Sequence, residues 1–429
     1  MSSGLAKQER SSDPKLDFSG FVSFEMGRVV NGWFKTHPIR EVWQERMMGG
    51  LSVDAKLKDN FHIIINPEFA LLFSTFDKFD AYNAFREAFV PAWSVYPGRM
   101  EGVYTVGDDE MPFLELGMGY FPYTYNTSST NFGNFLFRGT AYPFLLYNGF
   151  DGINESLLGF RLSNNLAKGV FHQDILFTSE AHRIPSQDFS LSYVAQATMG
   201  SVLKVGAGIS FDHLLSVDKL ETENNEEVYF YFESPADSAI ERIDTLTILG
   251  VTSHDTAWAK DTSYYDKGFR AVKAMLHASV DPKSLITWDA FGPEDLLFYG
   301  EIAMMGFENR GEFYSKRSER MPWMVGFNVP TFRLLDVLSL ELEHYPSPWK
   351  NNYQKVYDKR IAIPVGENKA EWRWSIWAEK TLDEVVVLKA MMAHDHMFTN
   401  TNWPDFVDRK EALSEKRNWH YRVKIVFRY

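Results

Sequence analysis

The sequence predicts an all-β fold, namely a single transmembrane, antiparallel, up-and-down β-barrel of about 16 strands with one loop folded inward. Three observations predict it. Apolar and polar side chains alternate in runs of about ten residues, the length that a tilted membrane-spanning strand needs. The connections between runs alternate between short and long, as turns and loops do in such barrels. The final run, which ends on Tyr429, has one apolar, aromatic face and one mostly cationic face.

The composition narrows the classes of protein to which the chain can belong. No run reaches the roughly 18 apolar residues of a membrane-spanning helix, so helical spanning is excluded. Aromatic residues make up 16% of the chain, which suits a barrel with aromatic girdles at both membrane interfaces. The absence of Cys excludes disulfides, thiolate metal sites and Cys nucleophiles. The net charge of −13 argues against a nucleic-acid partner, because phosphate binding relies on clustered Lys and Arg.

Each predicted strand is a run in which one face is apolar and the other polar. In the first run, Leu16, Phe18 and Phe24 share a face opposite Asp17 and Glu25. An even number of strands places both chain ends on the turn side of the barrel. The runs lie at 16–26, 51–57, 61–73 (with Pro67 at a bulge), 99–107, 112–123, 156–164, 170–180, 188–198, 202–213, 268–280, 296–307, 321–332, 336–345, 370–381, 384–395 and 418–429.

The connections between these runs follow the alternation of an up-and-down barrel, with two exceptions. His182–Gln187 is short for a loop, and 281–295 is long for a turn. The short connections are Lys58–Asn60, Asp108–Met111, Asn164–Gly169, Thr198–Ser201, Thr331–Asp336 and Thr381–Asp383. The long connections are 29–45, 74–98, 124–155, 214–267, 308–320, 346–369 and 396–417. We expect residues 1–15 to form a flexible lead-in rather than a signal peptide, and 16–429 to form one barrel domain.

The polar face of the strands predicts a water-filled lumen. A Lys or Arg that faces mid-bilayer lipid costs about 2–4 kcal/mol, so a face with many charges must meet water or other charges. A barrel of about 16 strands is also too wide for its own side chains to fill. The predicted pore-lining residues are Asp17, Glu25, Glu115, Arg138, Glu301, Glu341, Glu343, Arg373, Lys389, Arg422 and Lys424.

Acidic and basic inward positions are nearly balanced, which predicts no strong ion preference. Closing the barrel is expected to bring Arg422 and Lys424 beside Asp17 and Glu25. Two interpretations of these charges stay open. They form ion pairs that stiffen the wall, or they set up a transverse field that orients polar solutes.

The final strand carries a resemblance to a known family. Apolar residues at alternate positions lead to a terminal aromatic residue, a pattern that resembles the last strand of Gram-negative outer-membrane β-barrel proteins of the porin type: Tyr421, Val423, Ile425, Phe427 and Tyr429. The resemblance implies recognition of this strand by the outer-membrane assembly machinery, contact with lipid and lipopolysaccharide, and passive diffusion of small hydrophilic solutes. Similar porins are commonly homo-trimers. The resemblance does not identify a porin subfamily.

Three outer segments have distinctive sequences. The loop 124–155 is rich in Phe, Tyr and Gly and carries the single charge Arg138 between 126 and 150. An apolar loop of this length avoids bulk water, so we expect it inside the barrel, as a plug or a constriction, or against another subunit. The acidic loop 214–267 is expected to be solvated and to contain a hairpin of Val228–Phe232 with Leu246–Val251. Lys78–Val90 has the spacing of a short helix.

The sequence offers little evidence of an enzyme. His394-Asp395-His396 is the one compact cluster of catalytic residue types, and alternation places both His on the outward face near the outer rim, where His344 also lies. A zinc site needs three or four ligands, so we expect no metal and no cofactor. Two rivals to a porin remain: a surface receptor, adhesin or scaffold whose lumen is plugged by 124–155, and an outer-membrane hydrolase that uses His394 or His344.

Overall fold

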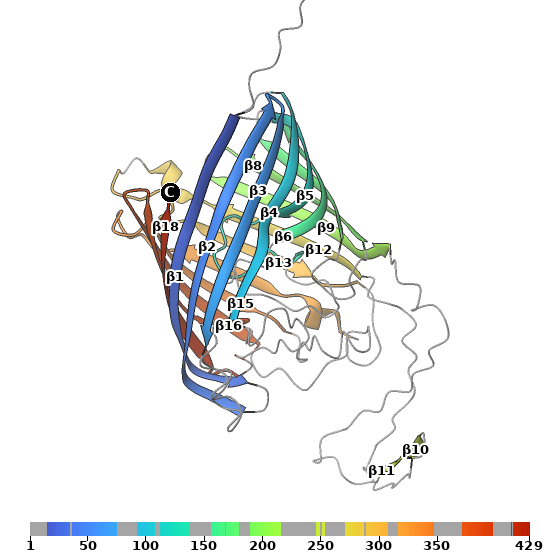
Figure 1. Ribbon diagram of the computed structural model, residues 1–429, viewed down its shortest axis with the longest axis vertical. Helices are drawn as coiled ribbons and strands as arrows, with labels where there is room; N and C mark the ends of the chain where they lie inside the picture. The colour runs from blue at the N-terminus through green and yellow to red at the C-terminus, as the bar shows by residue number, and fades with distance from the viewer. Residues whose placement is uncertain are drawn as a thin grey trace, which may run out of the picture.

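The computed structural model of the chain is a closed barrel of sixteen antiparallel strands, in which each strand pairs with its sequence neighbour and the last pairs with the first (Figure 1). The structure describes residues 15–34, 37–74, 92–107, 112–137, 156–167, 169–179, 189–215, 246–248, 251–253, 271–286, 289–307, 316–346, 371–397, 413 and 415–429. The predictions for 1–14, Arg138, the helix Lys78–Val90 and the strand Val228–Phe232 lie outside these residues.

All sixteen predicted strands are present in the barrel. They are β1 (Lys15–Phe34), β2 (His37–Lys58), β3 (Phe61–Ser74), β4 (Ala92–Gly107), β5 (Pro112–Pro122), β6 (Ser156–Leu166), β7 (Phe171–Ser179), β8 (Phe189–Met199), β9 (Leu203–Leu215), β12 (Ala271–Val280), β13 (Phe298–Met304), β14 (Trp323–Asn328), β15 (Val337–His344), β16 (Trp372–Leu382), β17 (Val386–His394) and β18 (Trp419–Arg428). Two 3-10 helices, Pro282–Leu285 and Arg317–Arg320, lie between strands.

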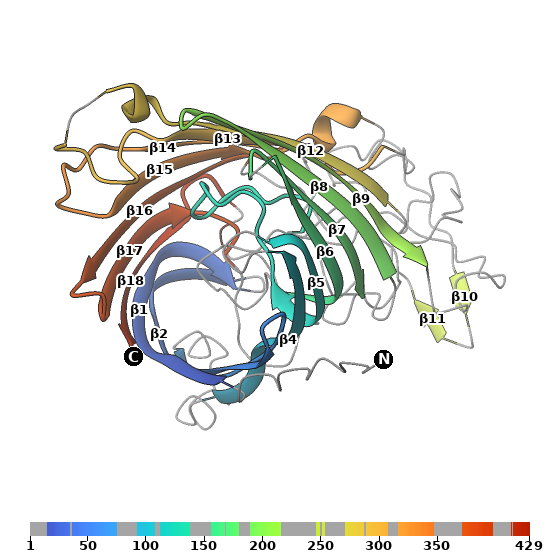
Figure 2. The same ribbon diagram turned by 90° about the horizontal axis from the view of Figure 1, so that it is seen from above.

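The barrel closes between β1 and β18, as the alternation at the end of the chain predicts (Figure 2). Glu25 lies opposite Lys424, and Val22 lies opposite Phe427. Gly20 and Tyr429 exchange two backbone hydrogen bonds of 3.0 and 3.1 Å. Closure leaves no unpaired strand edge, which is the condition for a sheet in lipid.

The two ends of the barrel differ. The turn end carries the tight connections, such as those at 59–60, 200–202 and 383–385, and the first and last described residues, Lys15 and Tyr429. The long connections leave the strands at the opposite end, which we call the loop end. Most outward positions are exposed and apolar, as at Phe18 and Phe24 of β1, whereas the inward row of the same strand carries Asp17 and Glu25. Among the described residues, no helix is long and apolar enough to cross a membrane.

The first long loop was predicted wrongly. Residues 29–45 continue two strands, because β1 runs to Phe34 and β2 begins at His37, opposite it. The alternation fades there because the outward row itself becomes charged, at Arg28 and Glu45, while the backbone pairing continues. β4 likewise begins inside the predicted loop 74–98.

Two smaller predictions had opposite outcomes. The bulge at Pro67 is confirmed, because the register of β3 and β4 shifts between Asn66 and Pro67, where Pro cannot donate to the ladder. The assignment of Leu246–Val251 to one strand is wrong. Its two ends belong to β10 (Leu246–Ile248) and β11 (Val251–Ser253), which form a separate hairpin with Ile248 opposite Val251.

The candidate channel lumen

The segment after β5 folds into the barrel, as predicted for the loop that begins at 124. Residues 123–137 pass inside the ring of strands (Figure 2) and contact the inner wall on the side of β8 and β12–β15. We call residues 123–137 the inner loop. Its six residues from Asn131 to Leu136 are all buried, although they have no regular secondary structure. The wall must therefore satisfy their backbone groups.

Glu301 on β13 satisfies one half of the inner loop. Its carboxylate accepts hydrogen bonds from the backbone N–H groups of Asn134 (2.8 Å) and Phe135 (2.9 Å). It also accepts from the hydroxyl of Tyr125 (2.5 Å) and the side-chain amide of Asn126 (2.9 Å). Four donors on one buried carboxylate hold the loop in a single position against this strand.

Glu341 on β15 accepts the backbone hydrogen bonds of the other half of the inner loop. Its oxygens accept from the backbone N–H groups of Thr130 (2.6 Å), Asn131 (2.8 Å) and Phe132 (2.9 Å). The hydroxyl of Tyr299 donates to it at 2.8 Å. The two predicted pore-lining acids thus lie under the loop and anchor it, and neither faces open water.

Apolar packing and a buried cation complete the attachment. Phe132, Phe135 and Leu136 of the loop pack against apolar wall residues: Val194, Met275, Tyr299, Ala303, Met305, Met324 and Tyr345. Lys273 on β12 is fully buried, donates to the carbonyl of Leu136 at 2.8 Å and pairs with Asp212 at 2.6 Å. Loop and wall therefore form one core inside the barrel.

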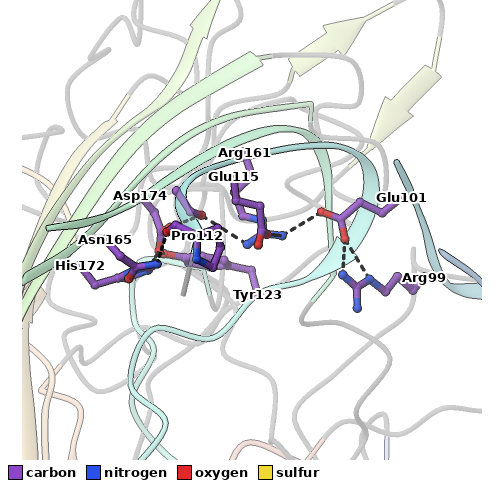
Figure 3. Close-up of polar contacts among 10 residues, drawn as sticks. Arg99, Glu101, Pro112, Glu115, Tyr123, Arg161, Asn165, His172 and Asp174 are labelled. Carbon is purple, nitrogen blue, oxygen red and sulfur yellow. Dashed lines mark hydrogen bonds and ion pairs between the residues drawn. The ribbon is translucent and has the colours of Figure 1, made fainter. Parts of the chain in front are cut away.

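A second group of wall charges lies on β4–β7, at the start of the inner loop (Figure 3). Arg161 pairs with Glu101 at 3.0 Å and with Glu115 at 2.5 Å, and Arg99 pairs with Glu101 at 2.6 Å. Arg99, Arg161 and Glu115 are only partly buried. Alternating signs on neighbouring inward rows produce an ion-pair ladder rather than a patch of one charge.

This ladder connects to the inner loop through Asp174 on β7. Asp174 accepts from the hydroxyl of Tyr123 at 2.7 Å and from Ser163 at 2.5 Å, and it contacts His172 at 3.1 Å. The ring of Tyr123 packs edge-on against Phe137 at the other end of the loop. Both ends of the described loop are thus tied to the same part of the wall.

The inward charges at the loop end of β15–β18 and β1–β2 are buried. Glu25 pairs with Arg46 at 2.9 Å and with Arg422 at 3.5 Å. Arg373 is fully buried and donates to the backbone carbonyls of Asp395 and Leu413. The residues after β17 and before β18 therefore also cover the wall from inside.

Exposure of the inward charges increases toward the turn end. On β1, the side chain of Asp17 near the turn end is 62% exposed, whereas that of Glu25 is 7% exposed. On β16, Glu379 keeps 22% of its side chain exposed and pairs with Lys389 at 3.0 Å, whereas Arg373 is fully buried. In the part of the chain that the structure describes, the wall is wet near the turns and covered near the loops.

The structure brings together some of the predicted site residues and separates others. Arg422 and Lys424 lie beside Glu25, as expected, but they do not lie beside Asp17. The last residue of the chain is level with Gly20, so β1 extends past β18 toward the turn end and Asp17 contacts Lys15 instead.

The outward placement of His396 was wrong. β17 ends at His394, so alternation does not extend to the two residues that follow. His396 turns inward and shares a hydrogen bond of 2.5 Å with Glu343, and Asp395 contacts His420 at 3.0 Å. All four are buried, as is His394. His344 does face outward, with its ring against Trp323 and Trp372.

Several lumen residues could not be predicted from alternation and charge, or were not among the predicted lumen residues. Arg46 falls at the edge of a predicted loop, and Tyr123 and Asn131 carry no charge that would mark them. Arg99 and Glu101 share one face of a predicted strand and were detectable from their spacing alone. Among the described residues, no group of three His, Asp or Glu side chains has the arrangement of a metal site.

No protein-family model and no curated protein matches the chain. Solved structures do match. OmpF of Salmonella typhi in complex with daunomycin is 10% identical, with 96% of this chain and 97% of that chain aligned and a TM-score of 0.46. A triple mutant of the Rhodopseudomonas blastica porin is 8% identical (97% and 100% aligned, TM-score 0.44). OmpT of Vibrio cholerae in its trimer form is 11% identical (97% and 100%, 0.44). The chain is similar to these outer-membrane barrels in architecture and distant from each of them in sequence.

Proposed function

We propose that the chain is a porin in the outer membrane of a Gram-negative bacterium, through which small hydrophilic solutes diffuse passively. The observation that carries this proposal is the inner loop. A loop held along one wall of a sixteen-stranded barrel narrows the lumen, while the partly exposed charges at the turn end keep the remaining wall wet.

Such a channel selects by size and by the charge of its lining, without a covalent step. The ladder of Arg99, Glu101, Arg161 and Glu115 and the pair of Lys389 with Glu379 present both signs to the lumen. Paired charges of both signs favour polar solutes over apolar ones and give weak ion preference. The solutes fitting this lining are small, uncharged or weakly charged, and hydrophilic.

The partners follow from the same proposal. The exposed apolar outward rows would contact lipid and, at the loop end, lipopolysaccharide. The outward residues of the last strand, including Tyr421, Val423 and Phe427, would be read by the outer-membrane assembly machinery during insertion. A homo-trimer is the assembly that the family resemblance suggests.

Solute uptake by liposomes tests the proposal. Vesicles that contain the purified barrel should swell in iso-osmotic solutions of small sugars and stop swelling above a limiting sugar size. A barrel that permits no swelling with any sugar contradicts the diffusion proposal.

One observation favours a second function, a surface receptor or scaffold with a plugged lumen. The inward charges at the loop end, such as Arg373 and Glu343, are almost completely buried. If the covering segments close the lumen, vesicles should not swell, and a chain without residues 216–245 of the acidic loop should lose binding to its partner. Swelling that survives this deletion supports the porin.

A further inference from the structure

A pocket lies at the turn end of the barrel, away from the lumen residues described above. The described parts of the connection between β12 and β13 (281–286 and 289–297) pack beside the turn between β14 and β15 (329–336), and together with Lys380 on β16 they line an open pocket of about 770 Å³. This volume falls within the roughly 300–1,000 Å³ of small-molecule pockets. We call it the turn pocket.

Asp295 holds the two turns together. Its carboxylate is buried and accepts hydrogen bonds from the backbone N–H groups of Gly292 (2.8 Å), Thr331 (3.1 Å) and Phe332 (3.1 Å). The ring of Phe291 stacks on that of Phe332 at 5.8 Å. The pocket is thus fixed by contacts that span both turns, which a simple connection between strands does not need.

The lining combines three basic and three acidic side chains: Lys283, Arg333 and Lys380 with Asp281, Asp289 and Asp336. Lys283 pairs with Asp281 at 2.6 Å, and Lys380 pairs with Asp336 at 3.1 Å. All four of these paired side chains are partly exposed. The lining has no net charge, so a ligand that carries one positive and one negative group fits it without leaving an unbalanced charge.

The pocket opens at the edge of the lipid-facing surface. Lys380 lies on the outward row of β16, opposite Leu388, whose row is exposed and apolar. A cation in this row is tolerated near the membrane interface and disfavoured at the midplane. The outward positions Val280, Phe298 and Leu382 carry the apolar face up to the level of the turns.

Exposed apolar side chains on the turns themselves also indicate that the pocket lies at the membrane interface. Leu285 is 73% exposed and Leu334 is 78% exposed, and Ile286 and Phe332 are also exposed. A patch of this kind beside a charged pocket is unfavourable in bulk water and favourable among acyl chains. A charged but neutral lining beside exposed apolar side chains suits an occupant that has a zwitterionic head and an apolar body.

We propose that the turn pocket binds the phosphoethanolamine headgroup of a phospholipid in the leaflet at the turn end. The phosphate lies among Arg333, Lys283 and Lys380, the ammonium lies among the aspartates, and the acyl chains lie along Leu285, Ile286 and Leu334. A primary ammonium donates to carboxylates, whereas a quaternary ammonium has no N–H to donate, so ethanolamine is preferred over choline. The inference rests on the membrane location of the proposed function and not on its channel.

The test uses the purified full chain in neutral detergent and three lipids with the same acyl chains: phosphatidylethanolamine, phosphatidylglycerol and phosphatidylcholine. Native mass spectrometry during titration should show one phosphatidylethanolamine bound about tenfold more tightly than either other lipid. Arg333→Gln should weaken this binding by about tenfold, because it removes a charge-assisted contact to phosphate. Lys58→Gln, at another turn of the same end, should not change it.

Equal binding of the three lipids, or equal binding by the Arg333→Gln and Lys58→Gln variants, would overturn the proposal. If Arg333→Gln fails to fold, as judged by loss of the heat-modifiable band in electrophoresis, Lys283→Gln provides the same test. Vesicle swelling of the same preparations separates the two claims. Loss of lipid preference with normal swelling rejects the turn pocket alone, and lipid preference without swelling rejects the channel alone.

Discussion

The carboxylate of Glu341 accepts a hydrogen bond of 2.8 Å from the backbone N–H of Asn131, although the two residues lie 210 positions apart in the chain. This contact is one of several by which wall carboxylates position a loop that has no regular secondary structure of its own. The width of the lumen therefore depends on side chains of distant strands, and changing those side chains should change the behaviour of the channel.

Glu341→Gln should release one half of the inner loop. An amide keeps one acceptor oxygen and turns an NH₂ group toward the N–H groups of Thr130, Asn131 and Phe132. Each hydrogen bond to a charged group contributes about 1.5–3 kcal/mol, so losing one or two of them frees this half of the loop. We expect larger current fluctuations in single-channel recordings than in the wild-type chain.

Glu379→Gln is the matched control. It removes a wall carboxylate that pairs with Lys389 near the turn end and accepts none of the inner-loop hydrogen bonds described above. Its current noise should equal that of the wild type. Equal noise in the Glu341 and Glu379 variants would show that the carboxylate under the loop does not hold it.

Lys273→Met should destabilise the barrel strongly. The substitution leaves Asp212 as a buried carboxylate without its cation and removes a donor to the carbonyl of Leu136. Breaking a buried ion pair in this way costs about 3–5 kcal/mol. The midpoint of unfolding in urea should fall, whereas Lys204→Met, an exposed residue on the adjacent strand, should leave it within error.

Introduced cysteines should report where the lumen wall is wet. The chain has no Cys, so Lys389→Cys and Glu115→Cys each provide a single thiol on a partly exposed inward position. Both should react with a charged, water-soluble thiol reagent and reduce the conductance. Arg373→Cys, at a fully buried position, should react much more slowly. Rapid reaction at residue 373 would contradict the covered wall at the loop end.

The link between the two turns through Asp295 should weaken only in acid. Burial raises the pKa of Asp295, but the N–H groups of Gly292, Thr331 and Phe332 stabilise the carboxylate and hold its pKa below the usual 3.8. A lowered pKa in the folded state means that the carboxylate stabilises the turns fully above pH 3.8 and loses this effect as the pH falls through the folded value.

Hydrogen exchange measures this effect. The protection factors of the Thr331 and Phe332 amides should be the same at about pH 7 and about pH 5. They should decrease once the pH is well below 3.8. In Asp295→Asn they should be low at every pH. Loss of protection between pH 7 and pH 5 would indicate that another group holds the turns.

The strands were predictable from sequence because lipid and water impose opposite demands on alternate residues. Where the outward row is no longer apolar, or where the strand has ended, alternation no longer predicts the strand or the direction of its side chains. At Arg28 and Glu45 the outward row becomes polar, so the sequence indicates a loop although β1 and β2 continue their pairing. At Asp395 the strand has ended, so the alternation of side chains along β17 no longer predicts the direction of the His396 side chain.

The lumen was predictable only in part, for a related reason. Alternation identifies Glu301 and Glu341 as inward residues, but it does not reveal that a segment about two hundred positions away covers them. The contacts that bury them come mainly from backbone N–H groups of Asn, Thr and Phe residues, which have no sequence signature. The composition of 124–155 did predict that this loop avoids water, and Phe132 and Phe135 are buried accordingly.

The conductance of single barrels in a planar lipid bilayer shows whether water and ions cross the lumen. We expect stepwise increases in current as barrels insert, each step of uniform size, with larger or noisier steps from Glu341→Gln. A correctly folded barrel that inserts into the bilayer and carries no current, with or without this substitution, would contradict a water-filled lumen.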